Sequence, residues 1–155
     1  LTLKTNQFNL TTRRYQEEEI SKFSTSDDKI VECVQVSDKF GDNGTTGMYI
    51  VEKKNDEEWI IDTFLLSCRI MGRGVEEIMM NQIVEKAKLS GIKRIKGEFI
   101  PTAKNKPAEN FYENLGFKKE NEFWVFNTDN IMKKPEHIKV EKNEWEIVSN
   151  NIQGV

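Results

Sequence analysis

The sequence predicts a mixed α/β domain, and three features of the chain support this fold class. Strand-like segments at 30–36, 45–53 and 59–68 follow one another with short turns between them, which is typical of an antiparallel meander. Segments with helical periodicity then alternate with two further strand-like segments, at 92–100 and 123–128. The chain has 155 residues, which is long enough for one domain with its own hydrophobic core. We expect the order strand, helix, strands, helix, strand, helix, strand.

The elements before and inside the meander have clear signatures. Residues 8–15 are rich in Thr, Phe, Leu and Tyr, so they predict a first strand. Residues 16–24 (QEEEISKFS) predict a short helix, because acidic residues fall in its first turn, where the helix dipole favours them. The segment 59–68 is apolar at nearly every position, which indicates a central strand that is covered on both faces.

Two helices are predicted after the meander. Apolar side chains recur at helical spacing at Val75, Met79, Ile83 and Ala87. Gly91 is expected to end this helix, since glycine commonly follows the last helical turn. A second helix is predicted over about 107–115, with Gly116 just beyond its end. The remaining chain is polar and weakly patterned, and 145–148 (WEIV) suggests one late segment that packs back on the domain.

Composition and charge narrow the functional class. The formal net charge of −3 argues against non-specific nucleic-acid binding. No stretch approaches 18 consecutive apolar residues and no signal sequence opens the chain, so we expect a cytoplasmic protein with no membrane partner. Two cysteines, Cys33 and Cys68, and the single histidine, His137, cannot build a standard zinc site. We expect no metal, reduced thiols, and an exposed rather than catalytic His137.

A glycine-containing loop links the predicted central strand to the following helix. The sequence is FLLSCRIMGRGVEE at 64–77, and it places free backbone N–H groups at a helix N-terminus, where anions bind. Gly72 and Gly74 remove side chains, so that a phosphate group can come close. The pattern matches neither the P-loop nor the dinucleotide fingerprint. Two interpretations stay open, a phosphate cradle and a tight turn that needs positive φ.

Two motifs together resemble the GNAT family of N-acetyltransferases. The pattern R-x-x-G-x-G, formed by Arg69, Gly72 and Gly74 after a long apolar strand, is similar to the acyl-CoA pyrophosphate loop of that family. The segment 105–117 (NKPAENFYENLGF) is similar to its later signature, N-x-x-A-x-x-x-Y-x-x-x-G-F. Two motifs in the expected order are much more specific than either alone. The resemblance implies a mixed, mostly antiparallel sheet flanked by helices, and an acyltransferase activity.

The resemblance also implies where acyl-CoA, or phosphopantetheine on a carrier protein, would lie. The strand ending near Leu66 would splay from its neighbour at 95–100, and the pantetheine arm would pair with exposed backbone groups in the gap. The residues implied in holding the cofactor are Phe64, Leu65, Leu66, Arg69, Met71, Gly72, Arg73, Gly74 and Val75. Asn105 would contact the arm, or alternatively cap a turn. Tyr112 would protonate the leaving thiolate, or alternatively be an aromatic core residue whose hydroxyl reaches solvent.

Three segments narrow the resemblance further. The segments 4–15 (KTNQFNLTTRRY), 64–77 and 101–117 resemble the carboxy-terminal region of the FkbH-like proteins. Those proteins load glyceryl units onto acyl carrier proteins in polyketide pathways, and an amino-terminal phosphatase-like domain usually precedes this region. The resemblance therefore implies two partners, an acyl carrier protein and that phosphatase-like domain. The D-x-D nucleophile motif of the phosphatase does not occur in this chain, so phosphoryl chemistry is not assigned to it.

The missing phosphatase motif bears on domain organisation. Residues 1–155 are expected to form a single domain excised from a longer protein, which agrees with a chain that starts at Leu1. Two other functions stay open. One is a free-standing N-acetyltransferase that uses acetyl-CoA and an amine, and the other is a non-catalytic module that docks a carrier protein or steadies the phosphatase domain.

Cys68 is a candidate acyl relay at the end of the central strand. Arg69 and the helix N-terminus would lower the pKa of its thiol. A strand rises about 3.3 Å per residue, however, which places the pantetheine sulfur roughly 13–20 Å from the loop, near 62–64. Cys68 would then lie at the phosphate end of the slot. A buried structural cysteine is the simpler explanation, and Cys33 is expected to be a core residue.

Two carboxylates and a polar cluster complete the set of candidates. If the acceptor is an amine, Asp62 and Glu98 are the first candidates for the general base; otherwise they are strand carboxylates that face solvent. The polar cluster beside the first strand consists of Lys4, Asn6, Gln7, Asn9, Arg13 and Arg14. Within it, Asn6, Arg13 and Arg14 are candidates for binding a glyceryl phosphate group or the missing domain, and a solvated face is the alternative.

Overall fold

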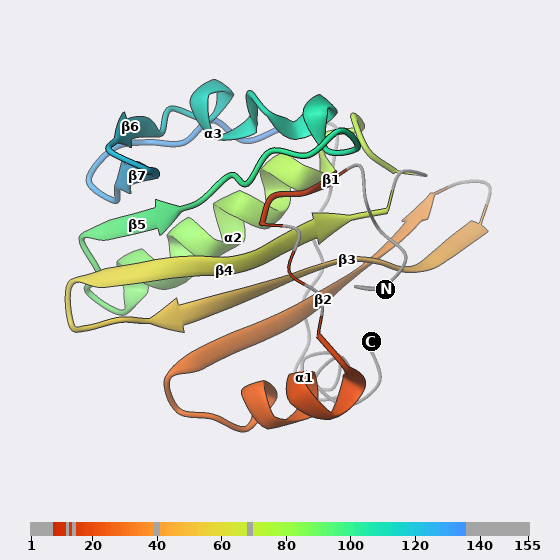
Figure 1. Cartoon of the computed structure of the whole chain (residues 1–155), viewed down its shortest axis with the longest axis horizontal. Coiled ribbons are helices and arrows are strands. Elements are labelled where there is room, and N and C mark those ends of the chain that lie inside the picture. Colours follow the sequence, from red (N-terminus) through yellow and green to blue (C-terminus); the bar gives the residue numbers. More distant parts are fainter. Residues whose placement is uncertain (1–7, 12, 14, 39–40, 68–69, 136–155) are drawn as a thin grey trace.

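The computed structural model describes residues 8–11, 13, 15–38, 41–67 and 70–135. The described strands form one seven-stranded sheet in the order β2-β3-β4-β5-β7-β6, and β1 pairs with β4 outside this path (Figure 1). The longer helices are α1 (Glu17–Ser24) and α2 (Val75–Leu89). The predicted fold class, a mixed and mostly antiparallel sheet flanked by helices, is confirmed.

A long antiparallel meander forms one half of the sheet. It consists of β2 (Lys29–Asp38), β3 (Gly41–Lys53) and β4 (Glu58–Leu66). The other half contains β5 (Arg94–Gly97), β6 (Lys118–Glu120) and β7 (Phe123–Asn127). Among the described pairs, β4 and β5 alone run parallel. The predicted meander is therefore confirmed, with β4 as its inner strand.

β4 is covered on both faces, as the apolar run at 59–68 predicted. Successive side chains of a strand point to opposite faces, so Phe64 and Leu65 serve different layers. Leu65 belongs to a small core cluster with Ile20 of α1. Phe64 belongs to the main core cluster with Met79 of α2. The two helices therefore hold β4 between them, and its position is fixed by burial on both sides.

α2 begins and ends where its apolar periodicity predicted. Gly74, the residue before the helix, has a φ of 89°, which is a left-handed conformation that suits glycine. Gly91 follows the helix with a φ of 75° and ends it, as expected. None of the described helices has both the length and the apolar character that crossing a membrane requires.

The predicted first strand is much shorter than expected. β1 covers only Phe8–Asn9, although Leu10 also donates its N–H to the Phe64 carbonyl on β4. Beyond that point the side chains of Thr11 and Arg13 make the next bonds to β4. The strand predicted over 8–15 was therefore too long, because after Leu10 this segment is joined to β4 by side-chain hydrogen bonds and not by backbone hydrogen bonds.

The predicted helix over 107–115 is also interrupted. It consists of the 3₁₀ turn η1 (Lys106–Ala108) and the short helix α3 (Phe111–Asn114). Pro107 lies in the first turn, where its missing N–H costs nothing, but Asn110 leaves the helical conformation before α3 starts. β6 was not predicted, because its three residues are all exposed and charged. The late segment 145–148 and His137 lie outside the described residues.

Candidate active site

The candidate site lies where β5 leaves the edge of β4. The parallel ladder of β4 and β5 ends at the pair Ile61 and Gly97, whereas β4 continues to Leu66. β3 pairs with the other edge of β4 all the way to Leu66. The edge of β4 beyond Ile61 is therefore the place where the two strands separate. This is the gap that the sequence predicted for a pantetheine arm.

A β-bulge marks the same point on β4. The β3–β4 register runs from Thr63 directly to Ile61, so Asp62 has no partner residue on β3. A bulge re-aims the side chain and the carbonyl group of the extra residue, and bulges are frequent beside active sites. The bulge explains how Asp62 comes to face the segment that follows β1 with both its carboxylate and its carbonyl oxygen.

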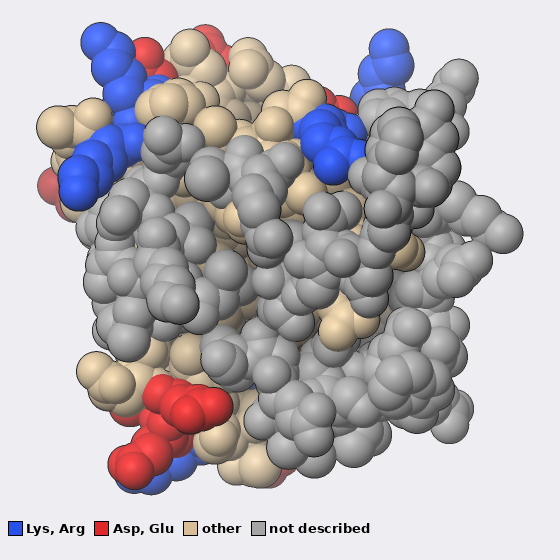
Figure 2. Space-filling view, turned by 90° about the vertical axis from the view of Figure 1, so that its right-hand side faces the viewer, with Lys and Arg blue, Asp and Glu red and all other residues tan. Residues whose placement is uncertain are grey.

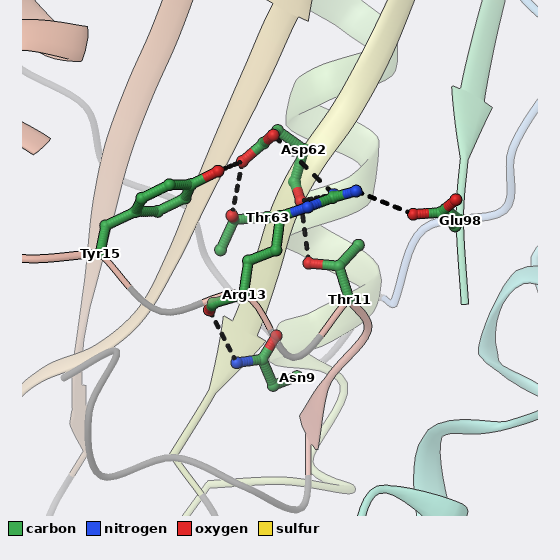
Figure 3. Close-up of polar contacts among 7 residues, drawn as sticks. All are labelled: Asn9, Thr11, Arg13, Tyr15, Asp62, Thr63 and Glu98. Atoms are coloured by element: carbon green, nitrogen blue, oxygen red, sulfur yellow. Dashed lines mark hydrogen bonds and ion pairs between the residues drawn. The ribbon is translucent and has the colours of Figure 1, made fainter. Parts of the chain in front are cut away.

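Arg13 joins the two carboxylates that the sequence singled out (Figure 3). Its Nη2 donates to Oε1 of Glu98 at 3.0 Å, and its Nη1 donates to the carbonyl oxygen of Asp62 at 2.9 Å. Nη1 also lies 3.8 Å from Oδ1 of Asp62. The hydroxyl groups of Thr11 and Tyr15 donate to the Asp62 carbonyl and to Oδ2, at 2.9 and 2.8 Å. The structure therefore brings Arg13, Asp62 and Glu98 together at the gap.

Tyr15 was not among the predicted site residues. Burial and its hydrogen bond to Asp62 raise the pKa of its hydroxyl to about 12, so it remains a donor at neutral pH. The sequence carried no motif for this contact, because Tyr15 reaches Asp62 across 47 positions of the chain. The Asp62 carboxylate thus has a fixed orientation, held by a phenol on one oxygen and an arginine near the other.

Tyr112 places a buried hydroxyl at the end of the β4–β5 ladder. The side chain is 1% exposed and packs against the rings of Phe117 and Trp124. A Cβ atom built on Gly97 would lie 2.3 Å from the Tyr112 hydroxyl, so the phenol occupies the space above that glycine. The hydroxyl has no hydrogen-bond partner among the described residues. Burial first, and Glu98 second, raise its pKa, so it stays protonated.

Asn105 is fully buried and its side-chain amide makes three hydrogen bonds. Nδ2 donates to the carbonyl oxygens of Asn9 and Ile100, at 3.0 and 2.8 Å, and Oδ1 accepts the N–H of Thr102 at 2.7 Å. The amide therefore ties β1 to the loop that follows β5. Asn105 thus stabilises the loop much as the predicted turn cap would. A direct contact between Asn105 and a pantetheine arm stays a prediction.

The glycine loop turns into the start of α2 with Gly72 and Gly74 both in the left-handed conformation, as a tight turn requires, and its role as a phosphate cradle stays a prediction. Gly72 has a φ of 81°, and Gly72 and Arg73 are exposed at the loop. Sequence reasoning missed Glu76, which is 9% exposed and accepts a hydrogen bond from the backbone of Gly72. Burial raises the pKa of this carboxyl group. An acidic side chain therefore uses part of the amide cradle that was predicted for phosphate.

Four predicted residues have no described side chains. Cys68 and Arg69 of the loop, and Asn6 and Arg14 of the polar cluster, lie outside the described residues, so their roles stay predictions. Cys33 is 5% exposed in the core, as expected, and burial raises the pKa of its thiol to about 11. Among the described residues, no group of three metal-ligating side chains is gathered that would hold a metal ion.

The gap beside β4 is filled by β1. Phe8 pairs with Leu66 and Asn9 with Leu65 in an antiparallel ladder. Leu10 extends the contact, because it donates to the Phe64 carbonyl at 3.1 Å and accepts the N–H of Ile100 at 2.8 Å. The expectation that the backbone groups of Phe64, Leu65 and Leu66 are exposed is not met in this structure, because the chain's own first strand pairs with them.

Comparisons with known proteins agree with this architecture. The family model of the acetyltransferase (GNAT) family matches residues 7–117, which is more than half of the chain. A domain from Methanocaldococcus jannaschii superposes with a TM-score of 0.58 at 16% identity, covering 74% of this chain and 77% of that one. No curated protein matches the sequence.

Two solved acetyltransferases also share the fold. A ribosomal-protein-alanine N-acetyltransferase from Escherichia coli has a TM-score of 0.56 at 12% identity, covering 84% of this chain and 86% of that one. An aminoglycoside 6'-N-acetyltransferase complexed with coenzyme A also has a TM-score of 0.56, at 11% identity, covering 77% and 81%. Identities this low establish the fold alone, and the family follows from the family model. The chain belongs to the acetyltransferase (GNAT) family of acyltransferases.

Proposed function

We propose that this chain transfers an acyl group from a phosphopantetheine thioester, with the thioester placed where β4 and β5 separate. The observation that carries the proposal is the hydroxyl of Tyr112, buried against Gly97 without a hydrogen-bond partner among the described residues. An unpaired buried hydroxyl costs about 1–3 kcal/mol, a cost that a bound thioester sulfur would relieve. Its raised pKa keeps the hydroxyl protonated at neutral pH.

The residues around the gap have complementary roles in such a reaction. The acceptor attacks the thioester carbonyl, the bond from carbonyl carbon to sulfur breaks, and Tyr112 donates its proton to the departing thiolate. Asp62 or Glu98 takes the proton that the acceptor loses. Arg13 contacts both carboxylates, so it fixes their positions and balances their charge. Each of these assignments is a proposal that the arrangement of the side chains supports.

The glycine loop would hold the phosphate end of the cofactor. Backbone N–H groups of Met71, Gly72, Arg73, Gly74 and Val75 lie at the start of α2, where the helix dipole favours anions. Glu76 has to withdraw its carboxylate, or keep it protonated, for a phosphate to use the Gly72 amide. CoA supplies a pyrophosphate at this position, and a carrier protein supplies a single phosphate.

Two versions of this function differ in the donor, and a non-catalytic module is the alternative to both. Loading of glyceryl or related acyl units onto an acyl carrier protein, next to a phosphatase-like domain, is supported by the three segments that resemble FkbH-like proteins. A free-standing N-acetyltransferase is favoured by the two carboxylates at the gap, since an amine needs a base. A non-catalytic docking module is favoured by the strand that fills the gap.

Calorimetric titration with acetyl-CoA and with acetylated carrier protein, separately, tests the proposal. Binding of the carrier protein alone supports the loading function, and binding of acetyl-CoA alone supports the free-standing enzyme. Thiol release measured with the donor that binds then reports catalysis. The proposal fails if neither donor binds, or if a bound donor releases no thiol in the presence of an amine or thiol acceptor. A carrier protein that binds without any release of thiol supports the docking module instead.

A further inference from the structure

We infer that β1 is an exchangeable strand, and that a phosphopantetheine arm enters the site by replacing it along the edge of β4 beyond Ile61. This inference rests on the proposed function, since it describes how the same site is controlled. In the structure the site is closed by the chain itself, and the closed form is the one that Figure 1 shows, with β1 beside β4.

The pairing of β4 leaves no other edge for the cofactor. β3 occupies one edge of β4 from Trp59 to Leu66. β5 occupies the other edge up to Ile61, and β1 takes over that same edge at Leu65 and Leu66. A pantetheine arm, which carries two amide groups, binds a sheet edge in the way an added strand does. It therefore competes with β1 for the same backbone groups.

The bonds of the segment 8–13 match those that an arm in the gap would make. On one side Leu10 donates to the Phe64 carbonyl, and on the other it accepts the N–H of Ile100. The segment thus bridges β4 and the chain that follows β5, as a ligand lying between them would. An amide of the arm can take over both bonds of Leu10, so the Phe64 carbonyl and the Ile100 N–H remain paired in both states.

Side chains hold β1 in place at both of its ends. At one end, Arg13 and Thr11 donate to the carbonyl oxygen of Asp62, the residue at the bulge. At the other end, Phe8 packs edge-on against Phe111, with ring centroids 5.0 Å apart. Phe8 and Leu10 are 4% and 0% exposed. Leaving the gap exposes both apolar side chains, so the closed form dominates in the absence of a ligand.

A dominant closed form reduces the apparent affinity for the donor. The observed dissociation constant equals the intrinsic constant divided by the fraction of molecules in which β1 has left the gap. Any change that holds β1 on β4 must weaken donor binding, and any change that loosens it must strengthen binding. Arg13 is the side chain best placed to hold β1 in the gap, because it donates hydrogen bonds both to Asp62 of β4 and to Glu98, which directly follows β5.

A reversible disulfide between β1 and β4 tests the exchange. Asn9 and Leu65 are register partners, and the hydrogen bond from Leu10 to Phe64 makes theirs the close, non-hydrogen-bonded type of pair. Such pairs have the Cα spacing that a disulfide needs. The variant Asn9→Cys/Leu65→Cys is made with Cys68→Ala, and the same protein is titrated with acetyl-CoA and acetylated carrier protein when oxidised and when reduced.

The oxidised form is expected to bind about tenfold more weakly than the reduced form, or not measurably. In the reduced form, donor binding is expected to speed hydrogen exchange of the Leu10 amide, because that N–H leaves the Phe64 carbonyl. Arg13→Gln is expected to bind the donor more tightly. Arg94→Gln is the matched control, since Arg94 makes a similar ion pair with Glu58, 2.9 Å long, at the closed end of the ladder.

The outcomes separate the two proposals. If the unmodified chain binds a donor and the oxidised disulfide form binds it equally well, strand exchange is overturned while the proposed function stands. Strand exchange is also overturned if donor binding leaves the hydrogen exchange of the Leu10 amide unchanged. If the unmodified chain and the reduced variant bind neither donor, the proposed function fails, and the exchange for a donor fails with it.

Discussion

At the scale of single residues, the site depends on close packing around one glycine. Gly97 is the last residue of β5, and the Tyr112 ring lies where a side chain would stand. The sequence identified Tyr112 by its motif but gave no reason to notice Gly97, because their contact depends on the path of the chain between them. Asn105 was identified as well, and its bracing contacts became evident only with β1 in place.

Gly97→Ala tests that packing. The added Cβ would lie 2.3 Å from Cζ and Oη of Tyr112, which sit in a rigid ring, so the ring or the backbone has to move. We expect the free energy of unfolding to fall by about 1–3 kcal/mol in urea denaturation. Gly47→Ala is the control, because its Cβ would meet the flexible ends of Leu66 and Met79 and should cost less. Equal losses for both variants would contradict the account.

Asn105→Ala tests the brace between β1 and the loop after β5. The change leaves the buried carbonyl groups of Asn9 and Ile100 without their donor, so we expect a loss of about 2–4 kcal/mol in thermal or urea unfolding. Asn110→Ala, at an exposed position beside α3 without a side-chain cap, should change stability by less than about 0.5 kcal/mol. An Asn105 variant as stable as the parent would show that the brace is not formed.

At the scale of elements, the sequence predicted the strands and helices that have strong hydrophobic patterns, but it did not predict which strands pair with each other. β4 was identified from its continuous apolar run, and α2 from its periodicity, because burial dictates both patterns. The segment 8–15 indicated a strand, but no local pattern says that β1 pairs with β4 across more than 50 positions. The bulge at Asp62 was equally invisible, since it depends on how two strands shift against each other.

The start of α2 offers a test of pH dependence. Burial raises the pKa of Glu76 in the folded state, so the folded protein binds more protons than the unfolded one over the window from the unfolded pKa up to the raised value. Stability therefore falls as the pH rises through that window. Glu76→Gln should be more stable than the parent at pH 7, with the difference shrinking as the pH falls toward the ordinary carboxyl range.

A neighbouring glutamate gives the matched control for this prediction. Glu77→Gln removes a charge from the same helical turn, where an acidic group favours the helix dipole, so a small loss of stability is expected. The free energy of unfolding of both variants is compared by urea denaturation from about pH 4 to about pH 7, a range that covers the titration of carboxyl groups. A Glu76 variant that is less stable than the parent at pH 7 would contradict the role of burial.

At the scale of the whole molecule, the fold places the gap and the glycine loop at one end of β4. Figure 2 views the end of the molecule toward which β4 runs, and described Lys and Arg residues stand at its upper edge while Asp and Glu residues gather at the lower left. The sequence predicted the family and the gap, whereas the closure of the gap by β1 required the three-dimensional path.

The most direct test of the central claim is the rate of thiol release with Tyr112→Phe. Because the Tyr112 hydroxyl has no hydrogen-bond partner among the described residues, removing it should not destabilise the fold, and donor binding should lose at most the one contact between this hydroxyl and the sulfur. Tyr49→Phe is the control, since Tyr49 is a buried tyrosine whose hydroxyl donates to Glu32 away from the gap. We predict that Tyr112→Phe slows thiol release from the bound donor by about 10²–10⁴-fold, while Tyr49→Phe leaves the rate unchanged. Release by Tyr112→Phe at the rate of the parent protein would contradict the account.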